Sequence, residues 1–448
     1  MSGSSREFLE QVFTEALASV DARAAVRRTV SQDSQGALEI AGRRVPASAG
    51  LWVVAVGKAA AVMASALAEL IGGRLQGGLV ITGDGHGESL PDSLPLRFAG
   101  HPVPDSRGAR AAMELLDCVG RIPESDVLVV LLSGGASAMT SLPDGELSLS
   151  DLAEANRLML ECGADIHAIN TVRKHCSALA GGRLARAASS RRIEVLALSD
   201  VPGDLLSTIG SGPCVGDPTT FGDALGVVDR FGLRGGFPAK LLRHLEAGDR
   251  GELPESPFPG DPDLLGVRTE IVARNAMARA AAVAAARARG VDALDLGEIL
   301  EGEARVMGRR LAALARSARC SGPTLWVAGG ETVVTLAGEG RGGRSQELAL
   351  AAALEWARAG RGSALGMLAG GTDGRDGFTD AAGAFVDAEH PIPGALSVPD
   401  AQRFLENNDS HAFFDATGGL LRTGPTGTNV MDLVLIQLGG SAKGLTVG

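Results

Sequence analysis

The chain has 448 residues, of which 45% are hydrophobic, and a formal net charge of −11 at pH 7. This length predicts two domains, each large enough to bury a core. The acidic balance, with no basic stripe to offset it, argues against nucleic acid as a partner. Since no apolar run approaches the roughly 18 residues of a transmembrane helix, we also expect no membrane span.

The cysteines and the N-terminal residues indicate the cytoplasm as the compartment of this protein. Five cysteines are widely spaced and form no Cys-x-x-Cys pair, which argues against a disulfide framework or a structural zinc site and for a reducing environment. The first residues lack the apolar centre of a signal peptide. We therefore expect a cytoplasmic protein, and the sequence leaves a homodimer open.

The first half of the chain alternates apolar strands with helices. Strands are predicted at 51–56, 78–82, 126–132 and 193–198, and helices at 5–30, 58–71, 105–119, 148–162 and 165–188. Continuous apolar strands that alternate with helices predict a parallel sheet covered on both faces. In such a fold, ligands bind beyond the carboxyl ends of the strands.

A second α/β section follows a change in composition. Prolines and glycines crowd residues 232–266, which predicts a connector. Beyond it we predict strands at 269–273, 291–296, 323–328, 364–369 and 432–438, and helices at 275–289 and 302–318. The chain is therefore expected to consist of two α/β regions.

A glycine-rich stretch, Gly338–Leu348, attracts attention within this second section. It lies between a predicted strand at 332–336 and a predicted helix at 345–356. The unpaired N–H groups at such a helix start favour anions, and Arg341 and Arg344 add charge suited to phosphate. The alternative is a flexible turn with two solvated arginines.

Two loops of the first section have a similar character. Lys58 stands at a predicted helix start, where a cation opposes the helix dipole, so either a charged ligand explains it or it is a surface lysine. Ser133-Gly134-Gly135-Ala136-Ser137 follows the buried strand at 126–132. Its backbone N–H groups and hydroxyls could cradle an anion, although a tightly packed turn would have the same composition.

Two further stretches contain charged groups. Of the consecutive Arg173, Lys174 and His175, at most two can reach one site from a helix; a solvated face is the alternative. Asp200 and Asp204, at a strand end, could hold Mg²⁺, or one of them could accept a hydroxyl proton. Ordinary turn chemistry would also use Asp, Pro and Gly there.

Together, these phrases resemble one family, the class II glycerate 2-kinases with a C-terminal MOFRL domain. The resemblance runs from about residue 6 to the end. The matching phrases lie at 56–59, 100–105, 132–138, 199–204, 211–221, 329–332, 340–347, 371–383 and 426–433. Cys214, where Thr is expected, and Met431, where Asn or Asp is commoner, depart from the pattern without removing a charge.

The resemblance implies a fold and an activity. The fold would be a Rossmann-like N-terminal domain with a parallel sheet, residues 1–240, and a smaller α/β C-terminal region, residues 241–448, containing the MOFRL domain at about 322–440. The active site would lie in the interdomain cleft. The implied reaction is ATP-dependent phosphorylation of D-glycerate at its 2-hydroxyl, which gives 2-phosphoglycerate and ADP.

The site residues follow from the resemblance and from the loops above. Lys58 and Arg344 are the residues that the family indicates as catalytic, and Asp200 is expected to be a base or a metal ligand. ATP and Mg²⁺ are the expected cofactors, with Asp200 and Asp204 as metal ligands. Nucleotide-binding residues are predicted at Ser133, Gly134, Gly135, Ser137, Gly340, Gly342 and Gly343, and substrate-binding residues at Ser199, Asp204 and Arg173.

Two rival functions remain at this stage. The first is an NAD(P)H-dependent hydroxypyruvate reductase, since relatives of the family carry that label and Gly338, Gly340 and Gly343 match a dinucleotide fingerprint. Against it, a helix spans the positions where the ribose-binding acid should end a strand. The second is a sugar-acid sensor that keeps the fold without turnover.

Overall fold

The computed structural model describes residues 5–32, 37–394 and 396–439. The first four residues of the chain lie outside these ranges. Compact packing divides the chain into two units: unit 1 comprises residues 1–21 and 273–448, and unit 2 comprises residues 22–272. The domain division predicted at residue 240 stays a prediction.

Unit 2 is built on a six-stranded sheet with the order β6-β5-β4-β7-β8-β9. The pairings of β4 with β5 and β7, of β5 with β6, and of β7 with β8 are parallel. The strands are β4 (Leu51–Val56), β5 (Leu75–Gly83), β6 (Leu96–Ala99), β7 (Val127–Leu132), β8 (Arg192–Leu198) and β9 (Val267–Ala273). Because the chain builds outward from β4 first through β5 and then through β7, this is the Rossmann strand order, with its switch point between β4 and β7.

Helices cover both faces of this sheet, as continuous apolar strands require. Every residue of β7 is buried. On one face α3 (Ala60–Ile71) packs on the central strands and contacts α2 (Ala22–Thr29); on the other lie α4 (Ser106–Val119) and the short α8 (Arg183–Ala187). The predicted Rossmann-like parallel sheet is therefore confirmed.

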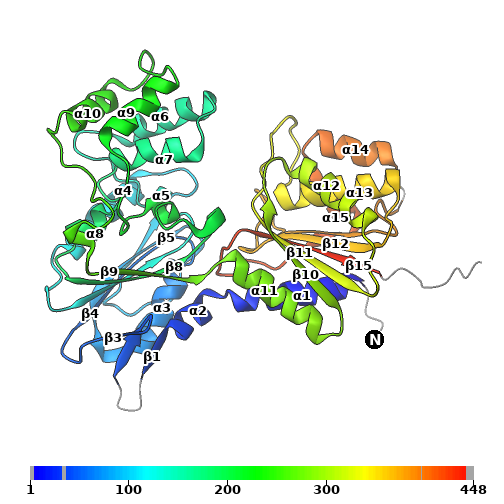
Figure 1. Ribbon diagram of the computed structural model, residues 1–448, viewed down its shortest axis with the longest axis horizontal. Helices are drawn as coiled ribbons and strands as arrows, with labels where there is room; N and C mark the ends of the chain where they lie inside the picture. The colour runs from blue at the N-terminus through cyan, green and yellow to red at the C-terminus, as the bar shows by residue number, and fades with distance from the viewer. Residues whose placement is uncertain (1–4, 33–36, 395, 440–448) are drawn as a thin grey trace, which may run out of the picture. The chain divides into compact units, whose positions relative to one another are not determined.

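Unit 2 carries two additions to the sheet. A helical layer has its own apolar core and consists of α6 (Leu149–Glu161), α7 (Ile166–His175), α9 (Phe221–Arg230) and α10 (Ala239–Asp249). Figure 1 shows these helices gathered together beyond the sheet. A small three-stranded antiparallel sheet is formed by β1 (Val30–Gln32), β2 (Leu38–Ile40) and β3 (Arg43–Arg44). The predicted connector at 232–266 thus contains a helix, α10.

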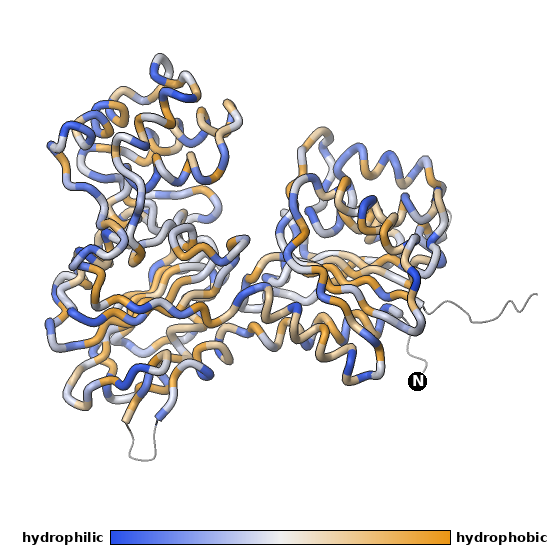
Figure 2. The backbone as a smooth tube through the Cα atoms, viewed as in Figure 1, coloured by the Kyte–Doolittle hydropathy of each residue, from blue (hydrophilic) through white to orange (hydrophobic). Residues whose placement is uncertain are grey.

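Unit 1 has a mixed sheet with the order β10-β11-β15-β12-β13-β14, in which only the β10–β11 pairing is parallel among the described strands. The strands are β10 (Asp292–Leu300), β11 (Thr324–Gly330), β12 (Ala364–Gly371), β13 (Gly383–Asp387), β14 (Leu420–Leu421) and β15 (Asp432–Leu438). Figure 2 shows apolar residues concentrated along these strands. This sheet confirms the predicted second α/β region, except that the strand predicted there at 269–273 is β9 of the unit 2 sheet.

Two helical layers cover the sheet of unit 1. One layer holds α12 (Ala304–Ser317), α13 (Arg344–Ala359), α14 (Val398–Glu406) and α15 (Ser410–Thr417); the other holds α1 (Ser5–Ser19) and α11 (Asn275–Ala288). Figure 1 shows the two layers on opposite faces. The α12–α13 layer buries a large apolar cluster against the sheet, and each large side chain that it fully buries contributes about 1.5–3 kcal/mol.

Three predicted elements are wrong in a physically instructive way. The helix predicted at 5–30 is two helices, α1 and α2, and the helix at 165–188 ends at His175 and resumes at Arg183. Gly181 and Gly182 between α7 and α8 have positive φ, which interrupts a helix. The strand predicted at 332–336 is absent from the described sheet, where Val333 makes a single isolated bridge to Glu303.

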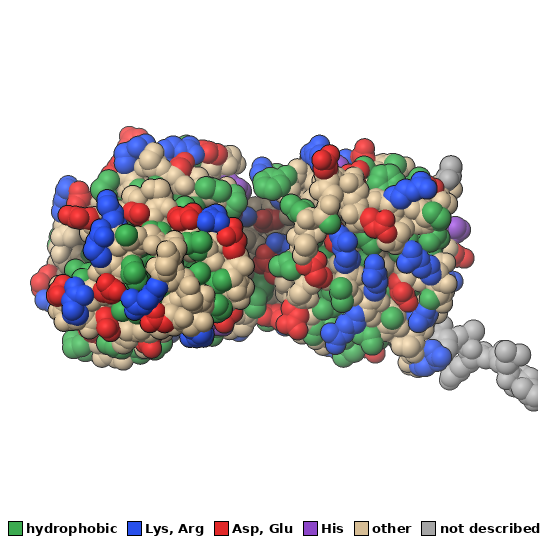
Figure 3. Space-filling view, turned by 90° about the horizontal axis from the view of Figure 1, so that it is seen from above, with side chains coloured by type: hydrophobic (Ala, Val, Ile, Leu, Met, Phe, Trp, Pro, Cys, Tyr) green, Lys and Arg blue, Asp and Glu red, His purple; other side chains and the backbone are tan. Residues whose placement is uncertain are grey.

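Charges of both signs are distributed over the surface of each unit. Figure 3 shows Lys and Arg side chains interspersed with Asp and Glu on the face in view. Many of them form exposed ion pairs, such as Arg157 with Glu154 and Arg107 with Asp84. No helix in the described ranges is both long enough and apolar enough to cross a bilayer.

Candidate active site

The loops after β4 and β7 lie at the switch point of the sheet and bind to each other. Lys58 N–H donates to the carbonyl of Gly134 at 2.9 Å, and Ala59 N–H donates to the Ser133 hydroxyl at 3.0 Å. Gly57 has φ +123°, and a Cβ there would overlap Ser133. Only glycine fits this close approach, so the sequence fixes the backbone of the Lys58 loop against the predicted anion cradle.

Ser133 therefore has a structural role that the sequence did not reveal. Its side chain is buried, and its hydroxyl accepts from the neighbouring loop. The half-buried Lys58 side chain extends from the other loop. The two predicted stretches thus form one rigid platform at the carboxyl edge of the sheet, which is where the fold class binds ligands.

A cavity of about 510 Å³ adjoins this platform, within unit 2. Its floor comes from the loops after β6, β7 and β8, and its opposite wall from α6 and α7. Four of the predicted site residues line it: Gly135, Ser137, Arg173 and Asp200. Lys58, Ser199 and Asp204 are outside this lining.

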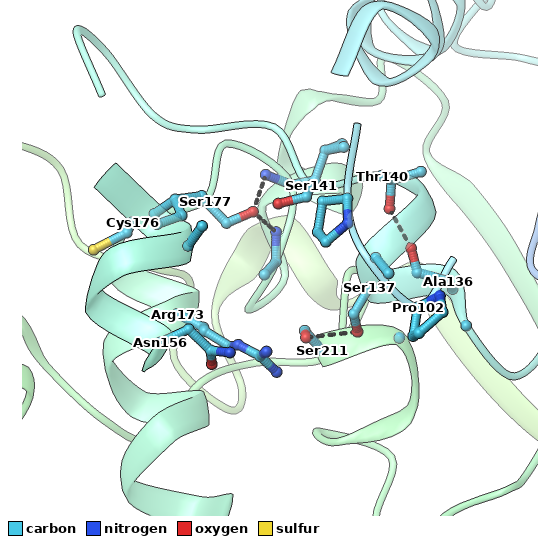
Figure 4. A pocket seen from close by; sticks show the side chains of 18 of the residues that line it. Pro102, Ala136, Ser137, Thr140, Ser141, Asn156, Arg173, Cys176, Ser177 and Ser211 are labelled. Atoms are coloured by element: carbon cyan, nitrogen blue, oxygen red, sulfur yellow. Dashed lines mark hydrogen bonds between the residues drawn. The ribbon is translucent and has the colours of Figure 1, made fainter. Parts of the chain in front are cut away.

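Hydroxyl groups gather on the floor of the cavity. The Ser137 and Ser211 oxygens lie 2.8 Å apart in a shared hydrogen bond, which Figure 4 shows. Ser211 has a positive φ of 62°, a conformation that non-glycine residues adopt rarely and often at functional sites. The two serines come from different loops, so the pair joins the β7 loop to the segment after β8.

Arg173 supplies the positive charge of this cavity. Figure 4 shows its side chain reaching from α7 toward the side where Ser137 and Ser211 lie. The surrounding protein lowers the pKa of Arg173 by desolvation, and within the described part of the chain no carboxylate offsets that effect. By contrast, the adjacent Lys174 is buried and donates to Asp217 at 2.6 Å. Of this cationic run, Arg173 is thus the residue that faces a ligand space.

Asp200 and Asp204 differ in position. Asp200 lines the cavity, whereas Asp204 closes a short 3-10 turn with a positive φ of 55°. Ser199 is buried and bonds locally to Val201 through its hydroxyl. Across the described ranges, no group of three or more His, Cys, Asp or Glu side chains is placed to hold a metal ion.

Sequence reasoning missed Asn156 and His101, both of which line the cavity. On α6, Leu149, Leu152, Asn156 and Met159 recur every three or four residues on one face. The sequence signal that could have indicated Asn156 is a single asparagine within an otherwise apolar face of this helix. His101 lies against Gly135, where a side chain would collide with the imidazole.

In unit 1, Arg344 is the first residue of α13 and is held by carboxylates. Its guanidinium forms a bidentate pair with the buried Asp432, with Nε–Oδ2 at 2.6 Å and Nη2–Oδ1 at 3.0 Å, and also contacts Glu331. These partners raise the pKa of Arg344, while burial raises the pKa of Asp432 against the opposing effect of Arg344. The arginine is therefore rigidly oriented.

The N-terminus of α13 binds an anion that belongs to the protein. Asp376 is buried and accepts from the backbone N–H groups of Ser345 and Gln346, at 3.0 and 2.8 Å. Burial and the nearby Asp432 raise the pKa of Asp376 to about 7, although its hydrogen bonds to Gln346 and Ser345 favour the carboxylate. The helix-terminus site predicted from the sequence thus exists, with an internal carboxylate in it.

The glycines before Arg344 are explained by packing. At Gly338, Gly340 and Gly342 a Cβ would overlap residues 407–410, and at Gly343 it would overlap Asp376. The N–H groups of Gly338 and Arg341 donate to Asn408 and Asp409, each at 3.0 Å. The loop is bonded along its length, which contradicts the flexible-turn alternative. The nucleotide-binding role of Gly340, Gly342 and Gly343 stays a prediction.

Comparisons with known proteins agree with this fold. Residues 8–246 match the model described as "Domain of unknown function (DUF4147)", and residues 324–432 match the MOFRL family. A glycerate 2-kinase from Pyrococcus horikoshii is 36% identical over 96% of this chain and 96% of its own length. A relative from Agrobacterium vitis named "Putative hydroxypyruvate reductase" is 38% identical over 97% and 95%. The crystal structure of a glycerate kinase from Thermotoga maritima superposes with a TM-score of 0.82, at 34% identity, covering 96% of this chain and 99% of that one.

These matches extend over both units and almost the full chain. The chain belongs to the glycerate 2-kinase family that combines the DUF4147 and MOFRL regions. The resemblance found in the sequence motifs is confirmed.

Proposed function

We propose that this protein transfers the γ-phosphoryl group of ATP to the 2-hydroxyl of D-glycerate. The bond from the γ-phosphorus to its bridging oxygen breaks, a bond to the C2 oxygen forms, and the hydroxyl proton leaves. The observation that carries the proposal is family membership along the whole chain, with named glycerate 2-kinases at 36% identity or above. The products are ADP and 2-phosphoglycerate.

The residues suit this chemistry because phosphoryl transfer depends on positioning and on positive charge around the moving group. We assign Lys58 to the charge of the transferred phosphoryl group and Arg344 to charge that develops in the transition state. The bidentate hold of Asp432 on Arg344 fixes the plane of the guanidinium, so little reorganisation accompanies the reaction. Asp200 either accepts the hydroxyl proton of the substrate or, together with Asp204, holds Mg²⁺.

The donor chemistry of unit 2 also fits Mg²⁺. Mg²⁺ is commonly bound by only one or two carboxylates together with phosphates and water, and Asp200 and Asp204 supply two carboxylates after β8. These residues would hold the ion, which would neutralise phosphate charge when bound. We further propose a cytoplasmic location and leave the homodimer as a prediction.

Product identification tests the assignment. The protein is incubated with D-glycerate, ATP and Mg²⁺, and phosphorus NMR distinguishes 2-phosphoglycerate from 3-phosphoglycerate. We expect the 2-isomer and one ADP for each product formed. NADH oxidation with hydroxypyruvate, the activity named for the Agrobacterium vitis relative, is measured in parallel. Reductase turnover without any phosphoglycerate would overturn the proposal, as would binding of glycerate without turnover.

A further inference from the structure

The cavity of unit 2 is too large for the acid alone. Its volume of about 510 Å³ falls within the roughly 300–1,000 Å³ that drug-sized ligands occupy, whereas D-glycerate has only three carbons. A polar substrate of that size would also be surrounded by polar groups. The size therefore indicates the larger of the two substrates of the proposed reaction.

The wall opposite the sheet is apolar. Leu149 and Leu152 from α6 line this space and are partly exposed, and behind them lie Met159, Val172 and Leu241, which are buried in the core of the helical layer. An aromatic base, which is flat and poorly hydrated on its faces, gains free energy by leaving water for such a wall. The triphosphate and the glycerate carboxylate would gain none there.

One polar group interrupts this apolar wall. Asn156 lines the cavity, and its Oδ1 is buried without a hydrogen-bond partner in the described part of the chain. An unsatisfied buried carbonyl oxygen is destabilising unless a ligand bonds to it. An asparagine amide offers one acceptor and one donor side by side, which matches the donor and acceptor edge of adenine.

The charged end of the cavity completes the match. Figure 4 shows Asn156 and Arg173 on the same side of the cavity, with Arg173 reaching toward the Ser137–Ser211 pair. The Arg173 guanidinium, which has no carboxylate partner among the described residues, and the two hydroxyls form a subsite for phosphate oxygens. Groups suited to a base edge and to a phosphate thus line the same cavity.

We infer that this cavity binds the adenosine part of ATP, with Asn156 reading the adenine edge and Arg173 holding a phosphate. The inference rests on the proposed kinase function for the identity of the nucleotide. The inference makes Asn156 on α6 the residue that selects adenine, and it places the purine ring against the apolar wall.

Binding without turnover tests the inference separately from the kinase activity. Calorimetric titration with adenosine, AMP and ADP is carried out on the wild type, Asn156→Leu and Arg173→Met. Arg157→Met serves as the matched control because Arg157 lies next to Asn156 but pairs with exposed Glu154 and Glu161. We expect Asn156→Leu to weaken all three ligands by about 10- to 100-fold, the discrimination of one bidentate pair. Arg173→Met should weaken AMP and ADP but not adenosine.

Steady-state kinetics separates nucleotide from acid. We expect Asn156→Leu to raise KM for ATP and to leave KM for D-glycerate within about twofold. Asn156→Asp should raise the ratio of GTP to ATP use, because a carboxylate accepts from the two adjacent donors of guanine. If Asn156→Leu melts early, Asn156→Ser provides the same readouts.

The outcomes distinguish the two proposals. A raised KM for D-glycerate with unchanged AMP affinity would place the acid in the cavity and overturn the inference alone. Active enzyme with unchanged KM for ATP in both variants would do the same. A wild type that binds AMP through Asn156 but forms no phosphoglycerate would overturn only the kinase assignment.

Discussion

Each unit contains a glycine-rich loop and an arginine, yet the two regions use them differently. In unit 1 the loop before α13 is bonded to residues 407–410, Asp376 occupies the helix start, and Arg344 is paired with Asp432. In unit 2 Arg173 has no carboxylate beside it in the described chain and faces a cavity. The same sequence signal thus produces a closed, charge-compensated network in one unit and an open binding surface in the other. Composition alone does not distinguish them; the location of the compensating acids does.

Substitution of Arg344 should have the largest effect and therefore tests the difference between the two units most directly. Arg344→Met leaves Asp432 buried without its partner, so we expect a loss of about 2–3 kcal/mol in unfolding free energy, below the roughly 3–5 of a fully buried pair because Arg344 is partly exposed. We also expect kcat to fall by about 10³-fold or more. Thermal melting and an ADP-release assay measure both. The double variant Arg344→Met/Asp432→Asn should regain stability without regaining activity; equal instability would contradict the closed network.

Substitution of Lys58 should lower activity strongly while hardly changing stability, unlike substitution of Arg344. Lys58→Met is expected to lower kcat by about 10³-fold while changing the unfolding free energy by about 1 kcal/mol or less, the range of substitutions outside the core. Lys240→Met, on the exposed face of α10, is the matched control. A wild-type rate for Lys58→Met would remove this lysine from the reaction.

The raised pKa of Asp376 should make the unfolding free energy of the protein depend on pH. Burial raises the folded-state pKa of Asp376 to about 7, above the ordinary value of 3.8, so the folded protein binds this proton more tightly than the unfolded chain. Its contribution is fully present below the unfolded pKa and is lost as pH rises toward 7. Relative to Asp376→Asn, the wild type should therefore lose about 1–3 kcal/mol between pH 5 and pH 8. Parallel urea titrations across this range measure it, and a flat difference would contradict the raised pKa.

Arg173 gives the smallest stability effect and the sharpest contrast with Arg344. Because Arg173 is exposed and has no carboxylate partner among the described residues, Arg173→Met should change the melting temperature by about 2 °C or less. Differential scanning calorimetry of Arg173→Met beside Arg344→Met tests this. A drop as large as that of Arg344→Met would mean that Arg173 belongs to a structural network as well.

Much of the fold could be predicted from sequence because long apolar strands and capped helices have strong local signals. β4 and β15 match the predicted ranges, and α6, capped by Ser148 with Asp151, matches within one residue. The errors lie where tertiary contacts decide, as at 332–336, where the chain leaves the sheet after Gly330. The site was predictable only in part: Arg173 and Ser137 lie in charged or glycine-rich phrases, but Asn156 does not. Nothing local to the 338–344 loop indicates that Asp376, more than thirty residues later, caps its helix.

The placement of α1 has a consequence for biosynthesis. This helix packs on α11 and on the β12–β15 region, all encoded after residue 272, so unit 2 is inserted into a unit that begins and ends the chain. During translation, residues 22–272 can complete their sheet while α1 still lacks the surface that covers Leu9, Val12 and Phe13. The part of this apolar face that packs on β12 and β15 stays uncovered until those strands have been synthesised. A protein truncated before residue 432 should therefore leave part of the apolar face of α1 exposed. Such a surface is a target for chaperones and for quality-control proteolysis.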